Sequence, residues 1–202
     1  MCSDCLTRTI QSWVGGLLIG ASEITSVFLA FNPKVAIREL GGAFTTARIS
    51  DLIDEQGRMK LNRGAVIVGA TFQRCEKHTR VFTFKQGLRP GADSTVVNCV
   101  GVFRVEHFIE TARIAVSFGS HAVLSEKVSQ RLRGKRHDEL VDHVDEFLEA
   151  LEEDISQFSS IPDFSYRRQL GRAAISSMCE DLCRRSTPAD EFSGDYLQLY
   201  TV

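Results

Sequence analysis

The sequence predicts an α+β fold in which a β-rich centre separates two helical zones. Apolar residues recur at three- and four-residue steps near both ends of the chain, whereas runs with a two-residue period fill its middle. The chain has 202 residues, of which 43% are hydrophobic and 25% charged, and a chain of this length buries a core without disulfides. We therefore expect a single domain over residues 1–185 and a tail over residues 186–202.

The first helical zone is expected over residues 1–32. Ile10, Trp13 and Leu17 open a series of apolar side chains at helical spacing. The zone ends before Pro33, because the residue that precedes a proline avoids the helical conformation.

A stretch of this zone, residues 10–31, is the nearest approach to a membrane segment. It carries a single charge, and its Gly16-x-x-x-Gly20 spacing is one that lets membrane helices pack closely. That charge, Glu23, would cost about 2.5 to 3.5 kcal/mol at the centre of a bilayer helix. We therefore expect a buried helix or helix pair, with a membrane-spanning or membrane-surface helix as the alternative.

Strands are expected over residues 33–119, which are rich in Val, Ile, Thr and Phe and are punctuated by glycine. Thr79–Lys85 alternates with a period of two, and Thr95–Val105 is apolar on both faces, as a central strand would be. Gly41-Gly42 indicates a turn. Five to seven strands with short connections predict a mainly antiparallel unit, as an open sheet, a small barrel or a sandwich.

Three helices are expected over residues 120–185. The first ends at Gly134, and a break at residues 159–163 separates the other two. The middle helix shows the clearest pattern of the chain, a continuous apolar stripe at helical spacing. The stripe consists of Leu140, Val144, Phe147, Leu148, Leu151, Ile155 and Phe158.

Charge is segregated in this C-terminal zone, where a basic run is followed by a helix without Lys or Arg between Asp138 and Phe158. Like charges at three- and four-residue spacing repel one another, so the acidic face requires compensation. We expect it to bind a basic protein partner or a second copy of the chain, the alternative being a solvated surface. The acidic residues are Asp142, Asp145, Glu146, Glu149 and Glu153.

The basic run offers the complement to this acidic face or, as a second reading, a surface for nucleic-acid phosphates. The net charge of −2 and the pI near 6.2 argue against strong nonspecific binding of nucleic acid. The cations of this second reading are Arg131, Arg133, Lys135, Arg136, Arg167 and Arg168.

Three pairs of soft ligands make zinc binding a hypothesis, although they are far apart and form no finger-like module. The pairs are Cys2 with Cys5, Cys75 with His78, and Cys179 with Cys183. The sequence alone predicts no metal site and no cofactor.

No catalytic motif is apparent. The two glycines Gly64 and Gly69 are followed by Ala70-Thr71, where a phosphate-binding loop needs Lys and Ser or Thr. None of the five histidines lies in a recognisable catalytic setting.

These observations together predict a non-enzymatic interaction or self-assembly protein that associates through its charged C-terminal helices, and a small viral structural or accessory protein would fit. Nucleic-acid binding is the first alternative, and an enzyme or ligand-binding fold without a recognisable motif is the second. The partner is expected to be a second copy or another protein. Because residues 1–8 show no basic signal segment, a cytoplasmic or nuclear location is expected.

Overall fold

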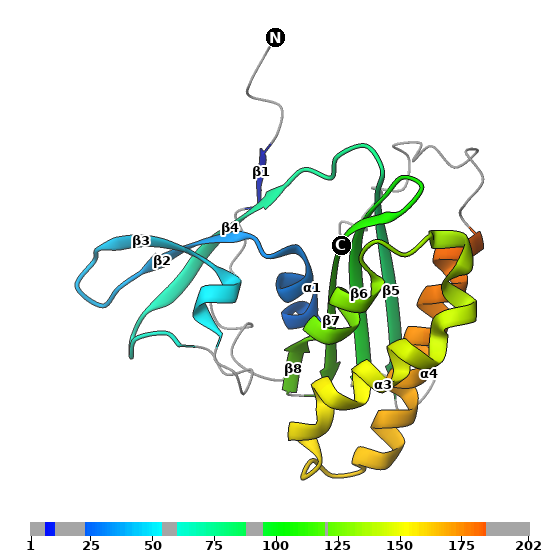
Figure 1. The fold of residues 1–202 in the computed structure, drawn as a ribbon. Helices are drawn as coiled ribbons and strands as arrows, with labels where there is room; N and C mark the ends of the chain where they lie inside the picture. The colour runs from blue at the N-terminus through cyan, green and yellow to red at the C-terminus, as the bar shows by residue number, and fades with distance from the viewer. Residues whose placement is uncertain (1–6, 11–22, 54–59, 88–94, 120, 185–202) are drawn as a thin grey trace.

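The computed structural model describes residues 7–10, 23–53, 60–87, 95–119 and 121–184 (Figure 1). They form two antiparallel sheets of four strands each and four α-helices. The α+β class and the antiparallel character that the sequence predicts are confirmed.

The first sheet, sheet A, has the strand order β1-β4-β2-β3, with every neighbouring pair antiparallel. A β-bulge between Ala36 and Ile37 shifts the register between β2 and β4. Its strands are β1 (Thr7–Ile10), β2 (Lys34–Arg38), β3 (Phe44–Arg48) and β4 (Val66–Gln73), and the 3₁₀ turn η3 (Ile49–Leu52) follows β3.

The second sheet, sheet C, follows chain order, β5-β6-β7-β8. Gly101 lies at its centre, opposite Phe82 on one neighbour and Ile114 on the other. A Cβ at Gly101 would lie 2.5 Å from the ring of Phe103, so glycine leaves the space that this ring occupies in the core. The strands are β5 (Thr79–Gly87), β6 (Thr95–Val105), β7 (Ile109–Phe118) and β8 (His121–Leu124).

Sheet C is buried on both faces, which confirms β6 as a central strand. Val97 and Cys99 belong to a core shared with the C-terminal helices, whereas Val100 and Val102 belong to a second core shared with α1 and sheet A. The helices are α1 (Glu23–Phe31), α2 (Glu126–Leu132), α3 (Val144–Ile155) and α4 (Phe164–Arg184), with 3₁₀ segments η4 (His137–His143) and η5 (Ser156–Phe158) flanking α3.

Two polar contacts hold α1 against sheet C. The Asn98 side-chain amide donates to the hydroxyl of Ser26 at 2.7 Å, in a buried position. The Arg113 guanidinium donates to the carbonyls of Leu29 at 2.8 Å and Ala30 at 3.2 Å. These carbonyls belong to the last turn of α1, where helical partners are lacking, so Arg113 fixes the end of the helix.

The apolar stripe of the middle C-terminal helix is confirmed as its buried face. Phe147, Leu151 and Ile155 are fully buried in the core that also contains Ile175 and Met178 of α4. Each of these residues removes a large apolar surface from water, which is the main stabilising contribution to such a helix pair.

The structure differs from the sequence-based expectation at two short strands. Thr7–Ile10 lies within the zone expected to be helical, yet it pairs with β4. His121–Leu124 was expected to open a helix, yet it pairs with β7 after a turn at Gly119, whose φ is +65°. Strands of four residues carry little periodicity of their own and form because a neighbouring strand offers them hydrogen bonds. The described part of residues 33–119 holds the six strands β2 to β7, within the five to seven that the sequence predicts for this zone.

No helix within the described ranges is long and apolar enough to cross a membrane. Helix α1 contributes nine residues of the 10–31 stretch, while residues 11–22 of that stretch lie outside the described residues. The expected tail over 186–202 lies outside them as well, and the domain boundaries stay a prediction.

Candidate functional site

A pocket of about 370 Å³ lies where the turn between β6 and β7 meets the start of η4. An isolated antiparallel bridge joins Phe108 to Arg136. Beside it, Ile109 donates its N–H to Lys135 O at 3.0 Å and accepts from Gly134 N at 2.9 Å. The pocket walls are therefore held by backbone hydrogen bonds. They are formed by His107, Phe108, Arg136, His137 and Asp138.

The charged side chains of the pocket neutralise one another. Arg136 donates to both oxygens of Asp138, from Nη2 at 2.7 Å and from Nε at 3.1 Å, and its Nε lies 3.3 Å from Glu139. Such bidentate pairs are the strongest exposed ion pairs. The hydrogen bond from Arg136 lowers the pKa of Asp138 to about 2. Asp138 therefore stays ionised near neutral pH and is unsuited to acid–base catalysis there.

His137 brings a different chemistry to the same pocket. Its ring is 14% exposed, and its Nδ1 is buried without a hydrogen-bond partner among the described residues; Asp138 Oδ1 lies 3.8 Å away, too far for a hydrogen bond. Burial, and then the charge of Arg80, lower the pKa of His137. The imidazole is therefore neutral near pH 7, and its buried Nδ1 is left unsatisfied within the described residues.

Helix α4 holds the backbone of His137 in place, because the thiol of Cys183 donates a hydrogen bond to the His137 carbonyl at 3.0 Å. Phe108 lines the same pocket and is 52% exposed. The pocket thus offers aromatic surface and one unsatisfied nitrogen but no excess charge. This combination suits an uncharged, planar ligand better than an ion.

The cysteine pairs do not form a metal centre in the part of the chain that the structure describes, which holds no cluster of three metal-ligating side chains. Cys179 lies in the core, and burial raises the pKa of its thiol to about 12. Cys75 is exposed, while Cys2 and Cys5 lie outside the described residues.

The acidic residues expected to bind a partner have two different environments. Glu146 pairs with Lys135 at 3.0 Å, and Glu153 pairs with Lys127 at 2.6 Å and with Arg131 at 3.6 Å; we call these five residues the helical ion-pair network. The remaining three are exposed and form no ion pair within the described residues. They are Asp142, Asp145 and Glu149.

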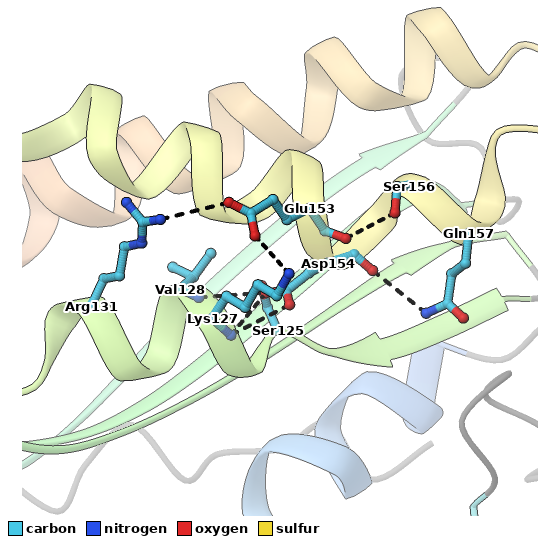
Figure 2. A network of polar contacts seen from close by, with 8 residues as sticks. All are labelled: Ser125, Lys127, Val128, Arg131, Glu153, Asp154, Ser156 and Gln157. Carbon is cyan, nitrogen blue, oxygen red and sulfur yellow. Dashed lines mark hydrogen bonds and ion pairs between the residues drawn. The ribbon is translucent and has the colours of Figure 1, made fainter.

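Asp154, which the sequence analysis missed, has the most defined role on this helix (Figure 2). Its Oδ2 accepts from the hydroxyl of Ser125 at 2.6 Å, from Lys127 N at 3.1 Å and from Val128 N at 3.4 Å. A carboxylate of α3 thereby satisfies the free N–H groups at the start of α2. The acid lies far along the sequence from the helix it caps, so no local signal could have identified it.

The arginines expected to bind nucleic acid do not form one basic stripe. Arg131, Lys135 and Arg136 pair with acids, as described above. Arg167 donates to the carbonyls of Pro162 at 3.1 Å and Val96 at 2.8 Å. Arg168 lies 3.6 Å from Glu152, and Arg133 is exposed. Most of these cations therefore hold the domain together.

A second surface, also missed from the sequence, lies on sheet A. Lys34 and Arg38 of β2 and Phe44 and Arg48 of β3 are exposed on one face, with Lys34 opposite Arg48 and Arg38 opposite Phe44. We call these four residues the hairpin face. Its three cations form no ion pair within the described residues, and Phe44 is 66% exposed. The two-residue alternation of Lys34–Arg38 is the signal that could have shown it.

No protein-family model matches the sequence, and no curated protein matches it. The fold does match solved structures. A CO dehydrogenase from Hydrogenophaga pseudoflava, described as lacking the Mo-pyranopterin moiety of the molybdenum cofactor, matches with a TM-score of 0.60 over 75% of this chain at 15% identity. Quinoline 2-oxidoreductase from Pseudomonas putida 86 matches at 0.61 over 82% with 14% identity. Reconstituted CO dehydrogenase from Oligotropha carboxidovorans matches at 0.64 over 80% with 12% identity.

The chain spans little more than half the length of these structures, between 53% and 57% of each. The likeness shows a fold that oxidoreductases use. It corrects three expectations from the sequence, since a non-enzymatic assembly protein, a viral protein and an RNA-binding protein are all contradicted by it. The sequence carries no sign of this fold, because a backbone can be retained at such low identity without any local catalytic motif.

Proposed function

We propose that this chain is a domain or subunit of an oxidoreductase. The observation that carries the proposal is the fold likeness over at least 75% of the chain to structures whose names are CO dehydrogenase and quinoline 2-oxidoreductase. Since the chain spans about half of those structures, the rest of the enzyme would come from another domain or a protein partner. This replaces the expected self-assembly through the C-terminal helices.

The pocket beside η4 supports a ligand-binding role within such an enzyme. Its volume of about 370 Å³ falls in the range of small-molecule sites. Its neutral imidazole and its exposed aromatic ring favour an uncharged, planar ligand over an anion, because Arg136 is already engaged by Asp138. A quinoline-like ring is a ligand of this class.

The test is to isolate the tagged full-length chain from its own cells together with whatever it binds. The preparation is examined for visible absorption, for metal content, and for reduction of an electron-accepting dye with CO or quinoline as donor. We expect a coloured, metal-containing complex that reduces the dye. A colourless, metal-free preparation that reduces no dye with either donor would contradict the proposal.

The pocket is tested in the same complex with His137→Phe, which removes Nδ1 while filling the space of the ring. If the donor binds there, this variant raises KM with little change in kcat, because it removes a binding contact. The matched control is Thr45→Ser, an exposed position on β3 in the other sheet, and it should leave both constants unchanged. Equal KM values for the His137→Phe variant and the wild type would remove the pocket from the proposal.

A further inference from the structure

Within the residues that the structure describes, strand β3 is an edge of sheet A, since it ends the strand order. Glu39 N donates to Ala43 O at 2.9 Å at one end of the β2–β3 hairpin, and Ile49 N donates to Pro33 O at 3.3 Å at the other. Hydrogen-bonded pairs alternate with unbonded ones along an antiparallel ladder. The peptide groups of Phe44, Thr46 and Arg48 therefore point away from β2, toward the position of a further strand.

An open edge of this kind is a template for another strand unless charge, proline or a covering element blocks it. The side chains of Phe44, Thr45 and Thr46 are all exposed, and the strand contains no proline. Phe44, Thr45 and Thr46 are also good strand formers. No other strand of the described ranges occupies this edge, so it can accept main-chain hydrogen bonds from an added segment.

The charge of the hairpin face indicates which segment would fit. Lys34, Arg38 and Arg48 lie on the same exposed face and have no acidic partner within the described residues. The Arg38 guanidinium lies 5.6 Å from the centre of the Phe44 ring, and Arg48 Nη1 donates to Asn32 O at 3.4 Å. Neither contact neutralises a charge.

Apolar side chains complete the surface. Val66 on β4, Arg38 on β2 and Phe44 on β3 lie opposite one another in a single row across the sheet. Val66 is 46% exposed and Phe44 66% exposed. An added strand would therefore lie beside Phe44 and Arg48 of β3, with Lys34 and Arg38 one strand further away on the same face.

We propose that β3 receives an extended acidic segment of a partner protein as an additional strand of sheet A. Main-chain hydrogen bonds supply the affinity in this mode of recognition, and the charges select the sequence. A second copy of the chain fits less well, because it would double the number of unneutralised cations on one face. Nucleic acid would match the charge, but it would not use the peptide groups of the edge. The proposal goes beyond the oxidoreductase role and does not depend on it.

The test follows amide signals of the isotope-labelled full-length protein by NMR as a synthetic peptide of alternating Glu and Val is added. We expect the largest shifts at Phe44, Thr46 and Arg48. A peptide of alternating Lys and Val should bind at least about tenfold more weakly, as expected for charge selection. A single-stranded oligonucleotide is added separately as the competing anionic probe.

Two variants separate the backbone contribution from the charge contribution. Thr46→Pro removes an outward N–H while leaving the β2–β3 ladder intact, since proline is tolerated on a strand edge. Arg38→Glu with Arg48→Glu reverses the face. Each should weaken binding of the Glu–Val peptide by about tenfold or more. The control, Lys77→Glu, lies in the exposed turn between β4 and β5 and should stay within about twofold.

Three results would overturn the proposal. The first is unchanged peptide affinity in the Thr46→Pro protein, and the second is an oligonucleotide that binds more tightly than the peptide. The third is a peptide-free protein whose molar mass is twice 22.5 kDa and falls to that value in Thr46→Pro, because a second copy would then occupy the edge. If Thr46→Pro loses the amide dispersion of a folded protein, the charge-reversed variant decides.

Discussion

The C-terminal helices and the β2–β3 hairpin are both rich in charge, yet they use it in opposite ways. In the helical ion-pair network, acids and bases from different helices approach one another at distances as short as 2.6 Å. On the hairpin face, three cations share an exposed surface without an acidic partner in the described structure. A dense charge pattern therefore does not by itself mark a binding surface, because the fold can neutralise it.

The same contrast holds for apolar side chains. Phe147 of α3 is fully buried in the larger core, whereas Phe44 of β3 is 66% exposed. One phenylalanine contributes to stability, and the other is available for binding. A substitution of Phe147 should therefore destabilise the folded protein, whereas the same substitution of Phe44 should leave its stability almost unchanged.

The largest expected difference follows from replacing these two rings. Phe147→Ala leaves a cavity in the core and should lower the free energy of unfolding by about 3–5 kcal/mol. Phe44→Ala removes an exposed ring and should change it by less than about 0.5 kcal/mol. Urea denaturation of the two variants measures both values, and equal losses would show that the hairpin face is covered.

A smaller effect is expected at the cap that joins α3 to α2. Asp154→Ala leaves the N–H groups of Lys127 and Val128 without their acceptor, and the unfolding free energy should fall by about 1–3 kcal/mol. The matched control on the same helix is Asp145→Ala, where an exposed carboxylate has no ion-pair partner within the described ranges. A loss at Asp145 as large as that at Asp154 would argue against the capping role.

The exposed ion pairs should contribute less than the cap. Lys127 and Glu153 are each about half exposed, so Lys127→Met should cost between about 0 and 1 kcal/mol. Because salt screens exposed charges, the cost should shrink further in about 1 M NaCl. A cost that is unchanged by salt would mean that packing, rather than charge, is lost in this variant.

The smallest effect concerns pH. Burial lowers the pKa of His137 below its ordinary value of 6.5, so the unfolded chain binds a proton first as the pH falls. The stability due to this group is fully present above about pH 6.5 and declines below it. The thermal midpoint of His137→Phe should therefore fall less than that of the wild type between about pH 7.5 and about pH 5.

Asp138 does not complicate this measurement. Its pKa is lowered from 3.8 to about 2, so the stability that depends on its ionised form is lost only as the pH falls through those values, below the range scanned. A steeper decline in His137→Phe than in the wild type would mean that the imidazole is protonated in the folded protein.

Long elements with a strong period could be read from the sequence. The sequence of β6 is mostly apolar because the strand is buried on both faces. The sequence of α3 has an apolar stripe at helical spacing because the helix is buried on one face. Strands β1 and β8 could not be read in this way, since four residues form a strand only when a partner strand is present.

The candidate site depended on contacts between distant parts of the chain. Phe108 and His137 line the same pocket because the bridge between Phe108 and Arg136 joins the β6–β7 turn to the start of η4. The cap at Asp154 and the neutralised charges around it are equally non-local. The likeness in fold to solved oxidoreductase structures could not be found from motifs either, since it is visible only in the arrangement of the backbone.

The most direct test of the contrast compares two double variants with the same change in charge. Lys34→Glu with Arg48→Glu alters the hairpin face, and Lys127→Glu with Arg131→Glu alters the helical ion-pair network. The affinity for the Glu–Val peptide is measured for both. We predict a loss of about tenfold or more for the hairpin variant and a change within about twofold for the helical variant. Equal losses, or a larger loss in the helical variant, would contradict the central claim that unneutralised charge on sheet A forms the binding surface.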